Sequence, residues 1–229
     1  MALGDELRAE VRKIFREQWA VREGQKVPDV EDLKLGNDAV ELDAAVLYAD
    51  LAESTAMVDT YPWTFAAEIY KTYLHCASKI IRAEEGTITA FDGDRVMAVF
   101  IGKTKNTSAV RCALKIKYAV AEIVNPLLKE TYPKSAFDVG HVVGIDTSKL
   151  RVARTGVWGA NDLVWVGSAA NHAAKLSSLT RGYSYITKSV YDAMLDVAKF
   201  TNGENMWEAR TWTAMNDETI YRSSWRWKV

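Results

Sequence analysis

The chain has 229 residues and a formal net charge of −1, and 48% of its residues are hydrophobic and 26% charged. This composition is that of a globular protein, and it excludes disordered, collagen-like and low-complexity chains. The balance of 29 basic against 30 acidic residues argues against a nucleic-acid-binding surface, which usually carries a basic excess.

Cysteine content and hydropathy indicate the compartment. Cys76 and Cys112 are too few for a disulfide framework, and they lack the CxxC spacing of zinc or redox sites. No run approaches the roughly 18 consecutive apolar residues of a membrane-spanning helix. The N-terminus alternates acidic and basic residues instead of leading into an apolar stretch. We therefore expect a cytoplasmic protein with no membrane and no nucleic-acid partner.

The first predicted element is an amphipathic helical arm. Apolar residues from Leu3 to Trp19 recur at three- and four-residue spacing, and Gly24 is a suitable stop. We expect this arm to pack on the body of the protein or on a second copy. A membrane-surface role is the alternative, which the equal frequency of acidic residues disfavours. Residues 24–43 are predicted as a connector, so the predicted domains are 1–43 and 44–229.

Strand and helix patterns alternate from residue 44 onward. The run Ala44–Asp50 predicts a buried strand that ends in a carboxylate, and a helical pattern extends from Phe65 to Ile80. Segments 87–91 and 95–101 are strand-like and are joined by the tight-turn sequence Asp92-Gly93-Asp94. A second helical pattern covers residues 109–127.

The second half repeats this plan. Strands are predicted at 137–145 and 150–156, around a turn at Asp146-Thr147-Ser148, and further strands at 163–166 and 183–187. Helices are predicted at 169–179 and 189–197. The last 25 residues, which include Trp225 and Trp227, are predicted to form two closing strands with the tryptophans packed on the core. This order predicts an α+β sandwich, a sheet with helices packed over it.

Two pairs of residues have the chemistry of a phosphoryl-transfer site. Asp50 and Asp94 stand at a strand end and a hairpin turn, and two carboxylates brought together suit Mg or Mn, although aspartates there are more often turn-formers or caps. Asn171 and Lys175 are four residues apart on a predicted helix and share a face. A neutral donor beside a cation suits charge on a phosphoryl group, although both residues are also common on solvated helix faces.

Three segments, in this order, resemble the catalytic domains of class III nucleotidyl cyclases. Residues 48–55 (YADLAEST) are similar to the first metal-binding segment of that family, and residues 91–100 (FDGDRVMAVF) to the second, in which the Asp after Gly is the ligand. Residues 167–176 (GSAANHAAKL) are similar to the helix that carries an Asn and, four positions later, an Arg. Asp94 follows Asp50 by 44 positions, as is typical of the family. The resemblance runs roughly from Val46 to Tyr221 and implies a ferredoxin-like sandwich with a mostly antiparallel sheet.

The resemblance also implies ligands for metal and phosphate. Asp50, Asp94 and the backbone carbonyl of Leu51 would hold two divalent ions, Mn or Mg. Free backbone N–H groups at a helix start would bind the β- and γ-phosphates. The residues that would supply these groups are Ala52, Glu53, Ser54 and Thr55.

Asn171 would then orient the ribose, and Lys175 would neutralise charge on the α-phosphoryl group. The 3'-hydroxyl would attack the α-phosphorus, releasing pyrophosphate and a 3',5'-cyclic nucleotide. Lys175 stands where the family has Arg. This replacement keeps the positive charge but loses the bidentate contact that a guanidinium makes with phosphate. In homodimeric members the Asp pair and the Asn helix come from different subunits, so the resemblance implies a homodimer with shared active sites.

The base-reading positions depart from both purine patterns. Purine cyclases carry Lys or Glu four residues before the second metal Asp, and Asp, Thr or Cys seven before the Asn. Here these positions hold Ala90 and Val164, which offer only shape to a base. Selectivity must come from other groups. By position the candidates are Tyr48, Arg95 and Trp165, each of which also has a structural explanation.

This combination is similar to the Pycsar pyrimidine cyclases of bacterial antiphage defence. The resemblance implies conversion of UTP to cyclic UMP, preferably with Mn, and a separate effector protein that senses the product. Three alternatives stay open at this point: a cytidylate cyclase that makes cyclic CMP, an adenylate cyclase with altered base contacts, and an inactive nucleotide-binding module.

Overall fold

The computed structural model describes residues 2–229, which form two compact units. Unit 1 contains residues 2–43 and 149–167, and unit 2 contains residues 44–148 and 168–229. Two long strands, β2 (Asp38–Leu51) and β5 (His141–Val157), contribute residues to both units. The division into domains 1–43 and 44–229 stays a prediction.

Unit 1 consists of a helix, a short 3-10 turn and strand pairs. Strand β1 pairs in parallel with the first residues of β2, and β6 pairs antiparallel with the last residues of β5. The elements that lie wholly in this unit are α1 (Leu3–Arg16), β1 (Ala20–Glu23), η1 (Val30–Asp32) and β6 (Ala160–Val166).

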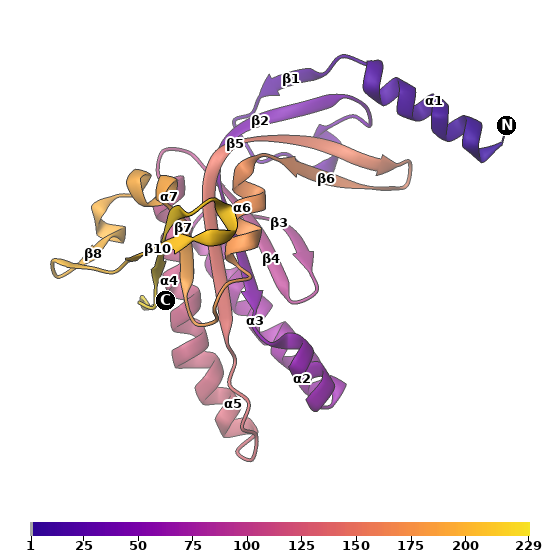
Figure 1. The fold of residues 1–229 in the computed structure, drawn as a ribbon. Helices are drawn as coiled ribbons and strands as arrows, with labels where there is room; N and C mark the ends of the chain where they lie inside the picture. The colour runs from indigo at the N-terminus through magenta and orange to yellow at the C-terminus, as the bar shows by residue number, and fades with distance from the viewer. Residues whose placement is uncertain (1) are drawn as a thin grey trace. The chain divides into compact units, whose positions relative to one another are not determined.

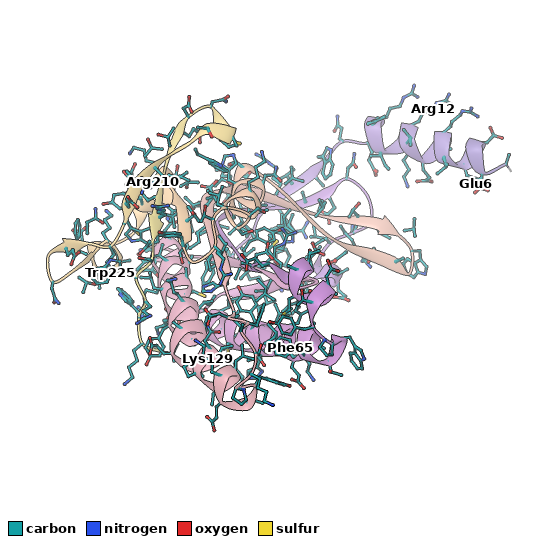
Figure 2. All side chains as sticks on the ribbon, turned by 60° about the horizontal axis from the view of Figure 1, so that its bottom comes forward. Glu6, Arg12, Phe65, Lys129, Arg210 and Trp225 are labelled. Atoms are coloured by element: carbon teal, nitrogen blue, oxygen red, sulfur yellow. The ribbon has the colours of Figure 1, made fainter. Side chains whose placement is uncertain are left out.

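The predicted amphipathic arm is confirmed as helix α1. All of its residues are exposed, including Leu3, Leu7 and Val11 of its apolar face. Figure 2 shows the labelled side chains of Glu6 and Arg12 extending from this helix. The predicted connector is wrong at its end, because β2 already begins at Asp38. Alternate residues there bury apolar side chains, which a count of acidic residues does not reveal.

The sheet in unit 2 has the strand order β10-β11-β7-β5-β2-β4-β3 (Figure 1). In this sheet β5 pairs with β7, and β1 with β2, in parallel. The pairs β10–β11, β11–β7, β2–β4, β3–β4 and β5–β6 are antiparallel. Strands β8 (Phe200–Thr201) and β9 (Glu204–Asn205) form a separate pair. The sheet strands that lie wholly in unit 2 are β3 (Thr87–Asp92), β4 (Arg95–Ile101), β7 (Ser184–Thr187), β10 (Glu208–Trp212) and β11 (Glu218–Ser223).

Helices cover the sheet of unit 2, which confirms the predicted α+β fold with a mostly antiparallel sheet. The larger core lies between the sheet and helices α3 and α4, and it contains Val143 and Ile145 of β5. A smaller core on the alternate residues of β5 joins Val142 to Leu176 of α6. The helices are α2 (Ser54–Thr60), α3 (Trp63–Ala83), α4 (Lys105–Ala119), the π-helix η2 (Val120–Val124), α5 (Asn125–Thr131), α6 (Ser168–Leu176), α7 (Lys188–Ala193), η3 (Asp196–Ala198) and η4 (Thr213–Met215).

No helix within residues 2–229 combines the length and apolar composition that a membrane crossing requires.

Two sequence predictions in this unit are wrong. The turn expected at residues 146–148 does not exist, because β5 continues through it. Partners far along the chain bind all three polar side chains there, so the segment stays extended. The last strand ends at Ser223, so Trp225 and Trp227 lie beyond it. Both tryptophans still pack against the larger core as expected, and Trp225 is labelled in Figure 2.

Candidate active site

Antiparallel pairing brings the two predicted metal-binding aspartates to one end of the sheet. Asp50 stands next to the end of β2 and is opposite Arg95, the first residue of β4. The hairpin between β3 and β4 contains Gly93 and Asp94, and Gly93 has a φ of +61°, a left-handed conformation that favours glycine. The hairpin turn therefore places Asp94 beside Asp50.

The electrostatics of the pair show uncompensated negative charge. Burial, and then the charge of Asp94, raise the pKa of Asp50 to about 6, although Arg95 acts in the opposite direction. The Oδ2 atom of Asp94 is buried and has no hydrogen-bond partner within residues 2–229. The buried Tyr73 hydroxyl also lacks a partner in the described chain, and burial together with the charges of Asp50 and Asp94 holds its pKa well above the usual range.

These residues fit a hard divalent cation. Carboxylate and carbonyl oxygens are the ligands that Mg²⁺ and Mn²⁺ prefer. The buried, unpartnered Asp94 oxygen supplies one such ligand, and Leu51 adds a backbone carbonyl directly after Asp50. The described residues hold no cluster of three or more His, Cys, Asp or Glu side chains that could bind a metal. At this end of the sheet the described residues therefore offer two carboxylates and a main-chain oxygen.

The segment after Leu51 differs in part from the expected phosphate loop. The backbone N–H of Ala52 is not free, because it donates to the carbonyl oxygen of Gly140 at 2.9 Å. Glu53 has a left-handed φ of 61° at the N-cap of α2, and its carboxylate is paired with Arg181. Ser54 and Thr55 form the first turn of α2, where backbone N–H groups have no acceptor inside the helix.

Tyr48 and Arg95 lie together beside the aspartates. The guanidinium carbon of Arg95 is 5.1 Å from the centroid of the Tyr48 ring, and both side chains are half-buried. Arg95 Nη2 is 2.9 Å from Asp92 Oδ2. The Nε of Arg95 is buried and has no hydrogen-bond partner in residues 2–229. Within the described chain, Arg95 therefore has an unpaired N–H donor next to the ring of Tyr48.

The two apolar base-reading positions lie in different units. Ala90 is half-buried in β3, opposite Met97 and next to an irregularity in the strand register. Val164 is 40% exposed in β6, where it lines a groove of about 440 Å³ within unit 1. Trp165, the next residue, is half-buried and pairs with Val152 of β5.

Asn171 and Lys175 lie on the exposed face of α6, as the four-residue spacing predicts. The Lys175 ammonium is 3.3 Å from the sulfur of Met215, and no described carboxylate lies within ion-pair distance of it. Within residues 2–229 no hydrogen bond or ion pair joins Asn171 or Lys175 to Asp50 or Asp94. The chain thus carries an aspartate pair and an Asn–Lys pair as separate groups of unit 2.

Sequence reasoning missed a pair next to Asn171, formed by a buried aspartate and a half-buried histidine. Asp146 Oδ2 is 2.9 Å from His172 Nδ1, and Asp146 is 3% exposed. The prediction placed Asp146 in a turn and found no zinc spacing around His172. The alternation of Gly144, Asp146 and Ser148 on one face of a strand is the signal that could have found this pair.

Comparisons with known proteins come from sequence and from structure. No family model matches the chain. It is 56% identical over 230 residues to a uridylate cyclase of Xanthomonas perforans and 53% identical over 231 residues to one of Burkholderia cepacia, and both matches cover the whole of both chains. A uridylate cyclase of Rhodovulum sp. (strain MB263) is 40% identical, over 99% of this chain and 98% of that protein.

Solved structures with a similar fold include nucleotidyl cyclases. The guanylyl cyclase Cya2 has a TM-score of 0.67 and 18% identity, over 82% of this chain and 94% of that one. The adenylyl cyclase CyaB from P. aeruginosa has a TM-score of 0.67 and 20% identity, over 81% and 95%. This similarity confirms the class III cyclase fold, and the full-length matches show the family. The chain belongs to the uridylate cyclase family.

Proposed function

We propose that the protein converts UTP to 3',5'-cyclic UMP and pyrophosphate through attack of the ribose 3'-hydroxyl on the α-phosphate. The observation that carries this proposal is full-length identity of 53–56% with proteins named uridylate cyclase. The cyclase fold and the uncompensated Asp50–Asp94 pair support the reaction type. The chemistry therefore belongs to unit 2, which contains both aspartates.

The metal-binding groups are the carboxylates of Asp50 and Asp94 and the carbonyl of Leu51. They would hold two divalent cations, Mn or Mg, which when bound lower the pKa of the ribose hydroxyl and neutralise phosphate charge. The raised pKa of Asp50 supports this role, because a nearby cation would relieve the repulsion between two half-buried carboxylates.

Other side chains and N–H groups bind and orient the substrate. The first turn of α2, with Glu53, Ser54 and Thr55, directs backbone N–H groups at the β- and γ-phosphates. Ala52 stays in this phosphate-binding segment by position, although its own N–H is occupied. Asn171 orients the ribose, and Lys175 places a point charge against the α-phosphoryl group.

The active protein is a homodimer in which each site combines the aspartates of one copy with the Asn–Lys pair of the other. Two observations support this. Asn171 and Lys175 are exposed on α6, and no described bond connects them to the aspartates of their own chain. A lone copy would therefore lack transition-state stabilisation.

Arg95 and Tyr48 favour uracil over cytosine. Uracil presents a carbonyl acceptor where cytosine presents an amino donor. The unpartnered Nε of Arg95 is a donor and suits the carbonyl, whereas it would oppose an amino group. Tyr48 lies under the guanidinium and supports its orientation. Ala90 and Val164 contribute shape alone.

The product is a second messenger in this proposal. The similarity of residues 48–55, 91–100 and 167–176 to pyrimidine cyclases of antiphage defence supports a cytoplasmic role in that defence. A separate effector protein would then sense the cyclic UMP.

The test supplies the purified protein with Mn²⁺ and each of the four ribonucleoside triphosphates, and separates the products by chromatography. We expect cyclic UMP as the main product and its loss in Asp50→Ala, with the folded state checked by thermal melting. Cyclic AMP or cyclic CMP as the main product would contradict the choice of base. No product from any nucleotide would contradict the activity.

A further inference from the structure

Helix α6 packs against strand β5 (Figure 1). The strand residues that contact it are Gly144, Asp146 and Ser148, which alternate along one face. A Cβ atom at Gly144 would lie 2.2 Å from the carbonyl oxygen of Ala173 and 2.6 Å from the nitrogen of Ser177, so helix backbone touches strand backbone there. At the other end, Ser148 Oγ accepts a hydrogen bond of 3.1 Å from the backbone N–H of Ala169. The helix therefore runs antiparallel to the strand.

Asp146 lies between these two contacts and is held on both carboxylate oxygens. Oδ2 is 2.9 Å from His172 Nδ1, and Oδ1 accepts a hydrogen bond of 2.5 Å from the Thr187 hydroxyl. A carboxylate only accepts, so His172 Nδ1 carries the proton in this bond. A buried carboxylate is costly unless its oxygens are paired, so these bonds fix the position of Asp146. Thr187 is itself fixed at the N-cap of α7.

The three contacts constrain the helix in different ways. Contact over Gly144 sets how closely α6 approaches the sheet, and the bond from Ala169 to Ser148 and the buried side chain of Leu176 hold its two ends. The bond from His172 to Asp146 adds a directional side-chain constraint on the rotation of the helix between those ends. Successive residues of an α-helix are turned by about 100°, so fixing residue 172 also fixes where Asn171 and Lys175 point.

We propose that Asp146 and His172 are positioning residues that set the rotation of α6 and thereby aim Asn171 and Lys175 at the substrate. This inference rests on the proposed function and adds to it a device that none of the predicted site residues includes. Neither side chain needs to touch the substrate. A small misplacement of a group that acts on the transition state is costly, and it lowers kcat more than it weakens binding.

The test compares His172→Asn with His172→Gln. Asn places an amide nitrogen where His has Nδ1, whereas Gln places it one bond further out, so only Asn keeps the donor to Asp146. Gln has a higher helix propensity than Asn. If the variants lost activity only because α6 became less stable, His172→Gln would therefore keep more of kcat than His172→Asn. We expect His172→Gln to lower kcat for UTP by about tenfold or more with KM within about twofold, and His172→Asn to retain most of kcat.

Ser178→Ala is the matched control, because Ser178 is exposed just beyond α6 and, among the described residues, its hydroxyl donates only to the carbonyl oxygen of Ala174, while its backbone bond to Lys175 is kept in the variant. It should leave kcat and KM unchanged. Equal kcat in the Asn and Gln variants would overturn the inference. The inference would also be overturned if the loss of activity came from a higher KM, or if it matched a loss of folded protein in thermal melts. A wild-type enzyme without cyclase activity would instead contradict the proposed function.

Asp146→Ala gives a second route to the same conclusion, because it removes the acceptor of His172 together with the bond to Thr187. In the double variant His172→Gln should lower kcat no further than Asp146→Ala does alone, because the shared bond is already lost. Independent, multiplying losses would show that the two residues do not act through their shared bond.

Discussion

At the scale of single residues, the site consists of groups that ordinary folding would avoid. Asp50 and Asp94 hold two carboxylates together at the end of the sheet, and one oxygen of Asp94 is buried without a partner in the described chain. Such an arrangement costs stability and is typical of functional sites, where opposite charge arrives with the ligand. The identities of these residues were predictable from motif and spacing, but the raised pKa of Asp50 was not, because it depends on burial.

Activity should fall as the pH falls through about 6, because Asp50 is protonated there and no longer binds a cation. Rates of cyclic UMP formation across pH, at saturating UTP and at several Mn²⁺ concentrations that begin well below saturation, would measure this. Bound cation lowers the pKa of Asp50, so the midpoint should move to lower pH as Mn²⁺ is raised. A midpoint that does not respond to Mn²⁺ would contradict the role of Asp50.

The stability of the cation-free protein should show the opposite trend. The folded-state pKa of Asp50 lies above its ordinary value of 3.8, so its contribution to stability is full at low pH and is lost as pH rises through about 6. Asp50→Asn should then raise stability at pH 8 by about 1 kcal/mol, after a discount for partial exposure. Thermal melts would measure the gain. The control is Asp59→Asn at an exposed position of α2, and it should leave Tm unchanged. A lower Tm for Asp50→Asn would contradict the repulsion between the carboxylates of Asp50 and Asp94.

At the scale of elements, local periodicity predicted most of the fold, and long-range contacts explain the errors. Helix α3 and strands β2 to β4 follow their apolar patterns closely. The error in β5 arose because Asp146, Thr147 and Ser148 are typical turn residues. Their partners lie 21 to 103 positions away, at Ala169, His172, Thr187 and Ala44, so no local window contains them. Two of these contacts, at Ala169 and His172, also hold α6 against β5.

Gly144→Ala should destabilise the protein, because the new methyl group would meet helix backbone that cannot move aside. Such overpacking costs about 1–3 kcal/mol, and kcat should fall as α6 is displaced. Gly4→Ala in α1 is the matched control: its Cβ would meet only the tip of Arg8 at 3.8 Å, so stability should hold or rise slightly. Thermal melts of both variants would measure the change in stability, and kinetics with UTP would measure the change in kcat. An unchanged Tm for Gly144→Ala would contradict the close approach of α6 to β5.

At the scale of the whole molecule, the chain carries two sets of site residues on separate elements. The aspartates lie at the end of β2 and in the β3–β4 hairpin, and Asn171 and Lys175 lie on α6. Full-length relatives named uridylate cyclase show the family, and we propose that both sets serve one reaction. The sequence predicted both sets through its resemblance to cyclases, but no pattern within one chain can reveal which copy completes a site.

Mixing two inactive variants tests the shared site most directly. Asp50→Ala and Asn171→Ala should each lose cyclic UMP formation from UTP while remaining folded and dimeric. Mixed in equal amounts and allowed to exchange subunits, they form heterodimers in which one of the two sites is intact. We predict that the mixture regains up to about a quarter of the wild-type rate, since half of the dimers are mixed and each has one working site. No regained activity, with subunit exchange confirmed, would contradict a site built from two copies.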